Sequence, residues 1–400
     1  MRIEYLYLLG SIAIGILASG VVAATFIIQY IKNQHNYCLV FEDEFNGPLN
    51  TSVWKHEVQV GGGLAGSFDW TTTSSNNSYT QDSNLYIVPT YTVDMIGEDA
   101  LRDGYTVNLT ADGSCTAPPT PWFRINNESP IVDAQHLPME VAIRNKDTDC
   151  QASSNLTLGT IIPPVQTASL NTNGTFAFKY GRVEVRARMP TGAWLAPSIK
   201  LLPRDNFYGA WPASGEIDVF QSKGNIPTSR AEKFSDTMRS ILHWGTVKDM
   251  DMAFKDNGIF QLFRNWFNQD YYTLGLDWDE NGITTWVNNP TKKVMNVNFK
   301  NPAIERYVWG TNGASSNVWS TNSTNAAPFD QDFFLQLDVA AGGTDGWFSS
   351  SGQPWSNGDP NAATSFWGSR ASWQKTWPSD PTQRGMAIDS VRVYQQCSKK

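Results

Sequence analysis

The 400-residue sequence has few charged residues, at 17%, and contains no block of lysines or arginines. Nucleic-acid-binding proteins carry clustered basic side chains, so this sequence, with a formal net charge of −8, argues against a nucleic-acid partner. It also has only four cysteines and four histidines, with no C-x-x-C pair and no His/Cys cluster. A zinc site is therefore not expected.

Helical periodicity is also scarce, and we find it only at 260–267. Short β-like runs recur instead, at 38–41, 84–89, 181–188, 273–278, 282–287, 333–339 and 387–394. In one of them Val183, Val185 and Ala187 alternate with charged residues, the pattern of a strand with one buried face. Many strands and few helices predict an all-β fold of two antiparallel sheets.

Aromatic residues are abundant, with 16 Trp, 14 Tyr and 20 Phe. Large β cores use aromatic rings as filling, which accounts for most of them. Several could also line a cleft, because flat apolar rings stack on sugar faces. The composition leaves both interpretations open.

Residues 6–28 form an apolar run without a charge. About 20 such residues can span a bilayer. A signal peptide is the alternative, with a shorter apolar core of about 7–15 residues and a weak cleavage site at 21–23. The length of the run favours an uncleaved anchor. We therefore predict a short N-terminus, anchor and tether at 1–37, and one domain at 38–400.

The stretch at 91–167 is the least strand-like part of that domain. It is rich in Asn, Asp, Pro and Thr, and it is predicted to be a long insertion. A second domain is the alternative, but the stretch has few apolar runs with which to fill a core.

Two features place the domain in the secretory pathway, either membrane-anchored or secreted. Seven N-x-S/T triplets without proline are glycosylation candidates, at Asn50, Asn76, Asn108, Asn127, Asn155, Asn173 and Asn322. Cys38 and Cys397 bracket the domain, so a bridge between them would join its ends, and Cys115 and Cys150 would then close an internal loop. Four cysteines allow three pairings, and the sequence does not choose among them.

The segment at 215–221 reads GEIDVFQ and carries the densest chemistry. Glu216 and Asp218 are two residues apart, so a strand points both to one face. Gln221 has an odd offset from Glu216, and a β-bulge between 218 and 221 would return it to that face. Such a row resembles the arrangement for retaining glycoside hydrolysis, in which two carboxyl groups lie about 5–5.5 Å apart, but with an amide in the third place.

The sequence resembles glycoside hydrolase family 16, the laminarinase-type β-glucanases, over roughly 41–395. This family includes fungal cell-wall glucanases and the catalytically silent β-glucan recognition proteins of invertebrates. The resemblance implies a concanavalin-like β-jelly roll with a concave substrate cleft. The motifs that carry it are FEDEFN at 41–46, YGRVEVRAR at 180–188, WPASGEID at 211–218, LHWG at 242–245, LGLDW at 274–278, VAAGGT at 339–344 and IDSVRV at 388–393.

Roles follow from the resemblance residue by residue. Glu216 falls on the nucleophile and Asp218 on the residue that holds and tunes it. Gln221 falls on the acid/base, where the active pattern has glutamate. Trp211 falls on an aromatic platform for the sugar, and His243 on a histidine of the cleft. An ordinary core histidine is the alternative for His243.

Trp194 and Arg186 are further candidates for substrate contact, although Arg186 could equally be a solvent-facing charge. Ser198 and Lys200 replace bulkier apolar residues, and Asp338 stands where asparagine is usual. These departures put the local geometry of the cleft in question.

No cofactor is expected, except that Asp389 matches a strand that contributes to a calcium site in some family members. The predicted partner is a cell-wall β-1,3(4)-glucan, with the membrane as a further partner through the N-terminal segment. The chain is expected to be a monomer.

Three functional interpretations remain at this stage. The chain binds β-1,3-glucan without cutting it, or it retains slow hydrolysis or transglycosylation, or it is an active glucanase altered from Glu to Gln at position 221. A purely structural surface protein would leave intact Glu216, Asp218 and Trp211 unexplained.

Overall fold

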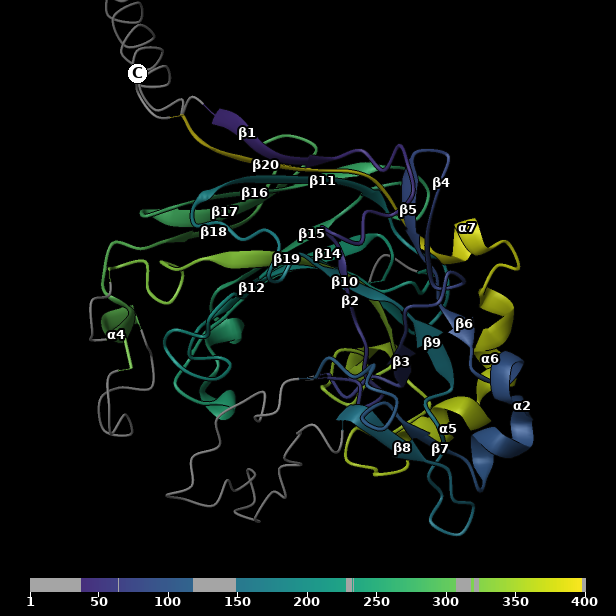
Figure 1. Ribbon diagram of the computed structural model, residues 1–400. Coiled ribbons are helices and arrows are strands. Elements are labelled where there is room, and N and C mark those ends of the chain that lie inside the picture. The colour runs from purple at the N-terminus through teal and green to yellow at the C-terminus, as the bar shows by residue number, and fades with distance from the viewer. Residues whose placement is uncertain are drawn as a thin grey trace, which may run out of the picture.

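The computed structural model describes residues 37–63, 65–117, 149–227, 232, 234–306, 318–319 and 324–397. They form two stacked antiparallel sheets, with helices α2, α5, α6 and α7 along one side (Figure 1). The predicted two-sheet all-β fold is confirmed. The predicted anchor at 6–28 lies outside the described residues, and among the residues that are described no helix is long and apolar enough to cross a membrane.

The first sheet has eight strands within the described residues. Seven follow the order β18-β17-β16-β11-β20-β5-β4, and β1 pairs with β20 beside this path. The first and last strands of the domain thus run side by side (Figure 1). The strands are β1 (Tyr37–Asp43), β4 (Ser78–Gln81), β5 (Asn84–Ile87), β11 (Gly181–Arg188), β16 (Tyr272–Asp279), β17 (Gly282–Val287), β18 (Lys293–Asn298) and β20 (Met386–Gln396).

The second sheet has seven strands in the described part of the chain and carries the cleft. Its order is β15-β14-β13-β12-β19-β10-β2, with every neighbouring pair antiparallel. The strands are β2 (Lys55–Glu57), β10 (Ser169–Asn171), β12 (Leu195–Pro203), β13 (Glu216–Gln221), β14 (Thr237–His243), β15 (Asn257–Gln261) and β19 (Phe333–Ala341).

Period-two alternation separates the core from the cleft in this second sheet. Ile199 and Leu201 of β12 are fully buried and belong to the hydrophobic cluster between the sheets. Ser198 and Lys200 alternate with them, and Lys200 lines the cleft on the opposite face. Each buried aliphatic side chain of this kind contributes about 1.5–3 kcal/mol to folding, so the alternation fixes which face of β12 the cleft receives.

Two small sheets and helices α2, α5, α6 and α7 lie at one end of the sandwich, whereas α4 lies at the other end (Figure 1). The three-stranded sheet has the order β3-β9-β6 and the two-stranded sheet pairs β7 with β8. The elements are β3 (Asp69–Thr71), β6 (Thr90–Tyr91), β7 (Thr106–Asn108), β8 (Gln151–Ser153), β9 (Val165–Thr167), α2 (Val93–Arg102), α4 (Ala303–Arg306), α5 (Ala362–Gly368), α6 (Arg370–Trp373) and α7 (Pro381–Arg384). Single-turn 3₁₀ helices occupy η1 (Lys248–Met250), η2 (Met252–Phe254), η3 (Ser349–Ser351) and η4 (Gln374–Thr376).

The predicted helix at 260–267 is wrong. Phe260 and Gln261 belong to β15 and pair with β14, and residues 262–266 form bends and irregular backbone. Pairing with a sheet edge satisfies the backbone there and overrides the apolar spacing. The longest described helix, α2, falls instead in the stretch at 91–167 that was predicted to be a long insertion.

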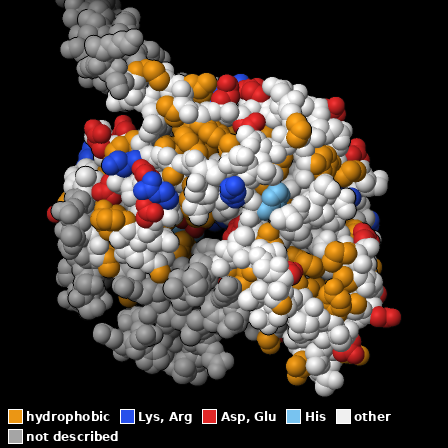
Figure 2. Space-filling view, in the orientation of Figure 1, with side chains coloured by type: hydrophobic (Ala, Val, Ile, Leu, Met, Phe, Trp, Pro, Cys, Tyr) orange, Lys and Arg blue, Asp and Glu red, His pale blue; other side chains and the backbone are white. Residues whose placement is uncertain are grey.

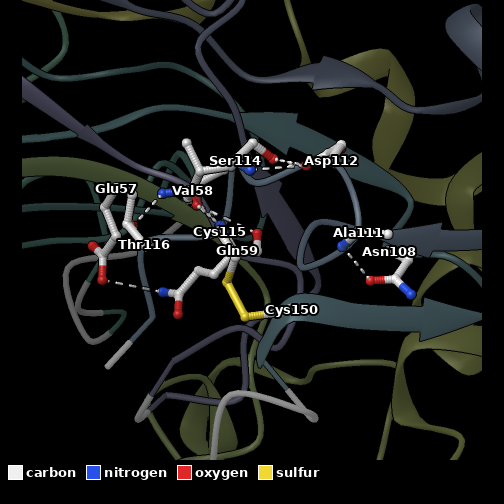
Figure 3. The surroundings of a disulfide bond; sticks show 11 residues. Glu57, Val58, Gln59, Asn108, Ala111, Asp112, Ser114, Cys115, Thr116 and Cys150 are labelled. Atoms are coloured by element: carbon white, nitrogen blue, oxygen red, sulfur yellow. Dashed lines mark hydrogen bonds between the residues drawn. A yellow bond between two sulfur atoms is a disulfide. The ribbon is translucent and has the colours of Figure 1, made fainter. Parts of the chain in front are cut away.

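Of the three possible cysteine pairings, the structure has the one in which a bridge joins the two ends of the domain. Cys38 bonds to Cys397 and Cys115 bonds to Cys150. The first bridge links β1 to the end of β20. The second lies beside Gln59 and Thr116 at the wall of the cleft (Figure 3).

Candidate functional site

The cleft is a cavity of about 1580 Å³ that crosses the second sheet from β2 to β15. Pockets for small ligands occupy about 300–1,000 Å³, so this space suits a segment of a polymer better than one small molecule. The space-filling view is hollowed near its centre (Figure 2). Seven of the residues marked out by the sequence line this cleft: Asn173, Lys200, Trp211, Glu216, Gln221, His243 and Asp338.

A glycine sets the entry into the central strand β13. Gly215 has φ +81°, and a Cβ there would lie 2.9 Å from Cε1 of Phe329. Another residue would be strained in its backbone and would press on this buried ring. Gly215 therefore fixes the direction in which Glu216 enters the cleft.

The predicted bulge in β13 is confirmed. Asp218 pairs with Ile241 of β14, but Gln221 pairs with Arg239, so the register shifts between 218 and 221. The extra residue brings Gln221 back to the cleft despite its odd offset from Glu216. Asp218 is fully buried beneath the cleft floor.

Glu216 is a buried carboxylate with one hydrogen bond and one nearby cation. Nε1 of Trp211 donates to its Oε2 at 2.7 Å, and Nζ of Lys200 lies 3.9 Å from its Oε1. Burial and the negative charge of Asp218 together raise the pKa of Glu216 to about 7, against the lowering effects of Lys200, His243 and the Trp211 hydrogen bond. This carboxyl group therefore holds a proton more strongly than a free glutamate does.

Asp218 connects Gln221 to the histidine. Nε2 of Gln221 donates to Oδ2 of Asp218 at 2.6 Å, and Nε2 of His243 lies 3.2 Å from the same oxygen. The other ring nitrogen of His243 lies 2.5 Å from Oδ2 of Asp251. Four side chains thus form one continuous polar chain under the cleft.

His243 lies between two carboxylates and carries a proton at neutral pH. Burial lowers its pKa, but hydrogen bonds to Asp218 and Asp251 raise it and dominate, so the pKa lies well above the usual value. With both ring nitrogens protonated, the imidazolium donates to both carboxylates. Trp211 packs nearby, with ring centroids 5.6 Å apart. The cleft interpretation of His243 therefore fits its position better than that of an ordinary core histidine.

Lys200 places a cation in the floor of the cleft. Its Nζ lies 3.6 Å from Oδ2 of Asp338, in addition to its approach to Glu216. Burial lowers the pKa of Lys200, but Asp338 and Glu216 outweigh this effect and raise it, so the ammonium stays charged. Oγ of Ser198 donates to Oδ1 of Asp338. The three departures from the family pattern therefore form one linked group.

Trp194 and Arg186 do not line the cleft, so the prediction that they contact substrate is corrected. Trp194 is 8% exposed and packs edge-on against Phe348 and Trp355 in the core. Arg186 lies on β11 in the other sheet, where it pairs with Asp389 at 2.9 Å. Its outward position on an alternating strand is that of the solvent-facing charge named as the alternative.

The ion pair with Arg186 also accounts for Asp389, the candidate calcium ligand. Within the described residues, no group of three or more His, Cys, Asp or Glu side chains is arranged to hold a metal ion. The structure offers no observation that favours calcium at this strand.

The glycosylation candidates divide by exposure. Asn50, Asn76, Asn108 and Asn173 are exposed, and Asn155 is partly buried. Asn127 and Asn322 lie outside the described residues. Asn173 also lines the cleft, so a glycan there would stand at its rim.

Several residues of the site were not identified from the sequence. Asp251 lies eight positions after His243 in a 3₁₀ turn, and no motif marks it as the partner of the histidine. Arg239 and Lys223 are also missing from the sequence predictions. In the structure Arg239 pairs with Gln221, and both side chains line the cleft. Cross-strand register was the missing signal in both cases.

Sequence comparison relates this chain to proteins with known names, although no protein-family model matches it. A β-1,3-glucan-binding protein of Penaeus monodon is 33% identical over 390 residues, which cover 95% of this chain and 96% of that protein. β-1,3-Glucan-binding protein 1 of Galleria mellonella is 30% identical over 360 residues, but these cover only 63% of that longer protein.

Solved structures with this architecture include laminarinases. The catalytic domain of an endo-1,3-β-glucanase from Thermotoga petrophila superposes with a TM-score of 0.52 at 18% identity, covering 91% of this chain and all of that one. An endo-β-1,3-glucanase from Pyrococcus furiosus gives a TM-score of 0.53 at 18% identity, covering 92% of this chain and 97% of that one. At this identity the likeness shows a shared fold.

Proposed function

The chain belongs to glycoside hydrolase family 16, with the β-1,3-glucan-binding proteins and laminarinases to which it is similar, and we propose that it binds β-1,3-glucan and cleaves it poorly or not at all. Its full-length relative from Penaeus monodon is named for glucan binding. The large cleft with Trp211 beside Glu216 supplies the surface for such a ligand.

The single observation that carries the proposal is the amide of Gln221 at the place of the acid/base. Glycosidic cleavage requires a proton on the bridging oxygen, because a sugar alkoxide is a poor leaving group. A carboxylic acid delivers that proton, whereas an amide has none to release at accessible pH. The Gln221 amide instead donates to Asp218 at 2.6 Å. General acid–base catalysis contributes about 10²–10⁴-fold, so turnover falls by that order.

Lys200 supports the same conclusion by a separate route. The transition state for glycosidic cleavage has oxocarbenium character, with positive charge developing at the anomeric carbon that the nucleophile faces. An ammonium 3.9 Å from Oε1 of Glu216 places a like charge close to that centre. In a partly buried site this repulsion is weakly screened, so Lys200 disfavours the transition state more than the neutral ground state.

Slow hydrolysis or transglycosylation is the second candidate, and intact Glu216 favours it. This carboxylate lies in the cleft with a Trp211 hydrogen bond and can attack an anomeric carbon. A substrate with an activated leaving group needs no proton from an acid. Such a substrate therefore tests for residual nucleophilic competence.

The two disulfides favour an oxidising compartment, and we propose an extracellular or lumenal location. Membrane anchoring through 6–28 and secretion after cleavage remain alternative proposals. Fractionation of cells expressing the full chain, with and without alkaline extraction, separates the two: an anchored chain stays with the membrane pellet.

Binding is tested by titration calorimetry with laminarin oligosaccharides, mixed-linkage glucan and galactan. Saturable heat with the β-1,3-linked ligand supports the proposal, and no heat with any of the three overturns it. Trp211→Ala serves as the matched variant, since it removes the platform from the cleft.

A further inference from the structure

The cleft has a cationic end beside Gln221 that the glucan-binding proposal does not use. Arg239 of β14 is the direct cross-strand partner of Gln221. Lys223 follows Gln221 by two residues in the sequence, just after the end of β13. All three residues line the cleft. Directly opposed residues in an antiparallel pair have Cβ atoms about 4.5–5.5 Å apart, so Arg239 lies next to the centre of the site.

Lys223 is a buried cation without a carboxylate in contact. It is 8% exposed, and its Nζ bonds to Oγ of Ser351 at 2.7 Å. The ion pairs found in the described part of the chain include none for Lys223 or Arg239. Burial and the like charge of Arg239 together lower the pKa of Lys223 to about 8, against a smaller opposing effect of Asp345.

The two cations share one aromatic ring. Nζ of Lys223 lies 5.4 Å from the ring centre of Trp347, and the guanidinium carbon of Arg239 lies 5.5 Å from it. Trp347 also lines the cleft. Two like charges held against one ring repel each other, and the cation–π contacts offset only part of that cost. An anion placed near both Lys223 and Arg239 would offset the repulsion between their charges.

We propose that Lys223 and Arg239 form a subsite for an anionic substituent, a sulfate ester or a uronate carboxylate, on a β-glucan chain that crosses the cleft. The planar guanidinium can bind such an oxyanion through two parallel hydrogen bonds, and the ammonium adds a point charge. The inference rests on the proposed function, since it places a charged group on a ligand that occupies the same cleft.

The carboxyl groups at the opposite end of the cleft disfavour an anion there. The carboxyl groups of Glu57, Asp69 and Asp338, of which Asp69 is buried, line the cleft toward β2 and β3. An anionic group at that end would meet these acids, whereas at β14 it meets two cations. Lys55 of β2 also lines the cleft, but its Nζ bonds to the backbone oxygen of Thr51. Lys55 is thus a cation of the same cleft outside the proposed subsite.

The test compares three ligands of equal chain length, which are neutral laminari-oligosaccharide, its sulfated form and its form oxidised to the uronate at C6. Dissociation constants are measured at low salt for the wild type and for Arg239→Gln, Lys223→Met and Lys55→Met. We expect at least one anionic ligand to bind about ten-fold more tightly than the neutral one. That preference is lost in Arg239→Gln and Lys223→Met and kept in Lys55→Met, and the better anionic ligand identifies the substituent.

Each outcome separates the inference from the proposed function. Neutral binding without an anionic preference overturns the subsite and leaves glucan binding standing. An anionic preference that survives both Arg239→Gln and Lys223→Met also overturns it, as does equal loss in Lys55→Met. Binding of anionic ligands alone supports the subsite and contradicts binding of neutral glucan. If none of the three ligands binds, both proposals fail. Unchanged neutral affinity in the variants shows that each is folded.

Discussion

The side-chain amide of Gln221 donates a hydrogen bond to the carboxylate of Asp218 across a β-bulge, at 2.6 Å. An acid/base glutamate in this place would meet the same carboxylate, and two such groups would share a proton. The Gln221 amide donates a hydrogen bond to Asp218 without sharing a proton with it. The bulged strand therefore keeps the geometry of a glycosidase site while lacking its transferable proton.

Restoring a carboxyl group at position 221 is expected to restore hydrolysis. Gln221→Glu should raise the release of reducing ends from laminarin by at least about 100-fold, because it supplies both the acid and the later base. Reducing-end assays over several polysaccharides measure the effect. Glu216→Gln in the same background is the control and should abolish the gain, since it removes the nucleophile. A gain that survives this second change would show that Glu216 does not act.

Removing the cation of the cleft floor should add to that gain. Lys200→Met combined with Asp338→Asn removes both members of an ion pair, so neither charge is left buried alone. In the Gln221→Glu background we expect a further rise in kcat of about ten-fold or more, because the like charge near the reacting carbon is gone. Asp338→Asn alone is the matched control. An unchanged kcat would show that Lys200 does not oppose the transition state.

Trp211 should carry much of the glucan affinity. A central tryptophan of a binding surface typically contributes about 2 kcal/mol, so Trp211→Ala should weaken laminari-oligosaccharide binding by roughly 30-fold. Titration calorimetry measures the change. Phe263→Ala removes an exposed ring, 69% accessible and absent from the cleft lining, and should leave the affinity unchanged. Equal losses in the two variants would contradict a specific role for Trp211.

The charge of His243 should depend on Asp251. Asp251→Asn removes a carboxylate that raises the pKa of the imidazole, so we expect that pKa to fall. The cleft would then lose a positive charge as pH rises through the new value. NMR titration of the ring protons reports this directly. Asp256→Asn is the control, because Asp256 bonds to Nε1 of Trp244 rather than to the histidine. A His243 pKa that stays raised in Asp251→Asn would show that Asp251 is not its cause.

The sequence predicted eight of the twenty described strands, where buried faces leave a period-two pattern or the chemistry of the site requires a strand. Gly181–Arg188 and Gly282–Val287 match the predicted ranges at both ends. The bulge in β13 was also predictable, since the chemistry of the site required Gln221 to face the cleft despite its odd offset from Glu216. Local pattern and chemical requirement agreed at these places.

What the sequence did not show depends on pairing between distant strands. The approach of Lys200 to Glu216 and the position of Arg239 beside Gln221 follow from register, which no local pattern encodes. Trp194 was a candidate for substrate contact, yet the rings of Phe348 and Trp355 pack against it in the core. The apolar spacing at 260–267 matched the period of a helix, but the start of this stretch forms a strand because it pairs with β14.

Native mass spectrometry of the chain after prolonged incubation with laminarihexaose tests the central claim most directly, because one spectrum reports both binding and cleavage. Binding without turnover predicts a complex heavier than the protein by one intact hexasaccharide. Protein without ligand, or protein carrying only shorter oligosaccharides, would contradict it.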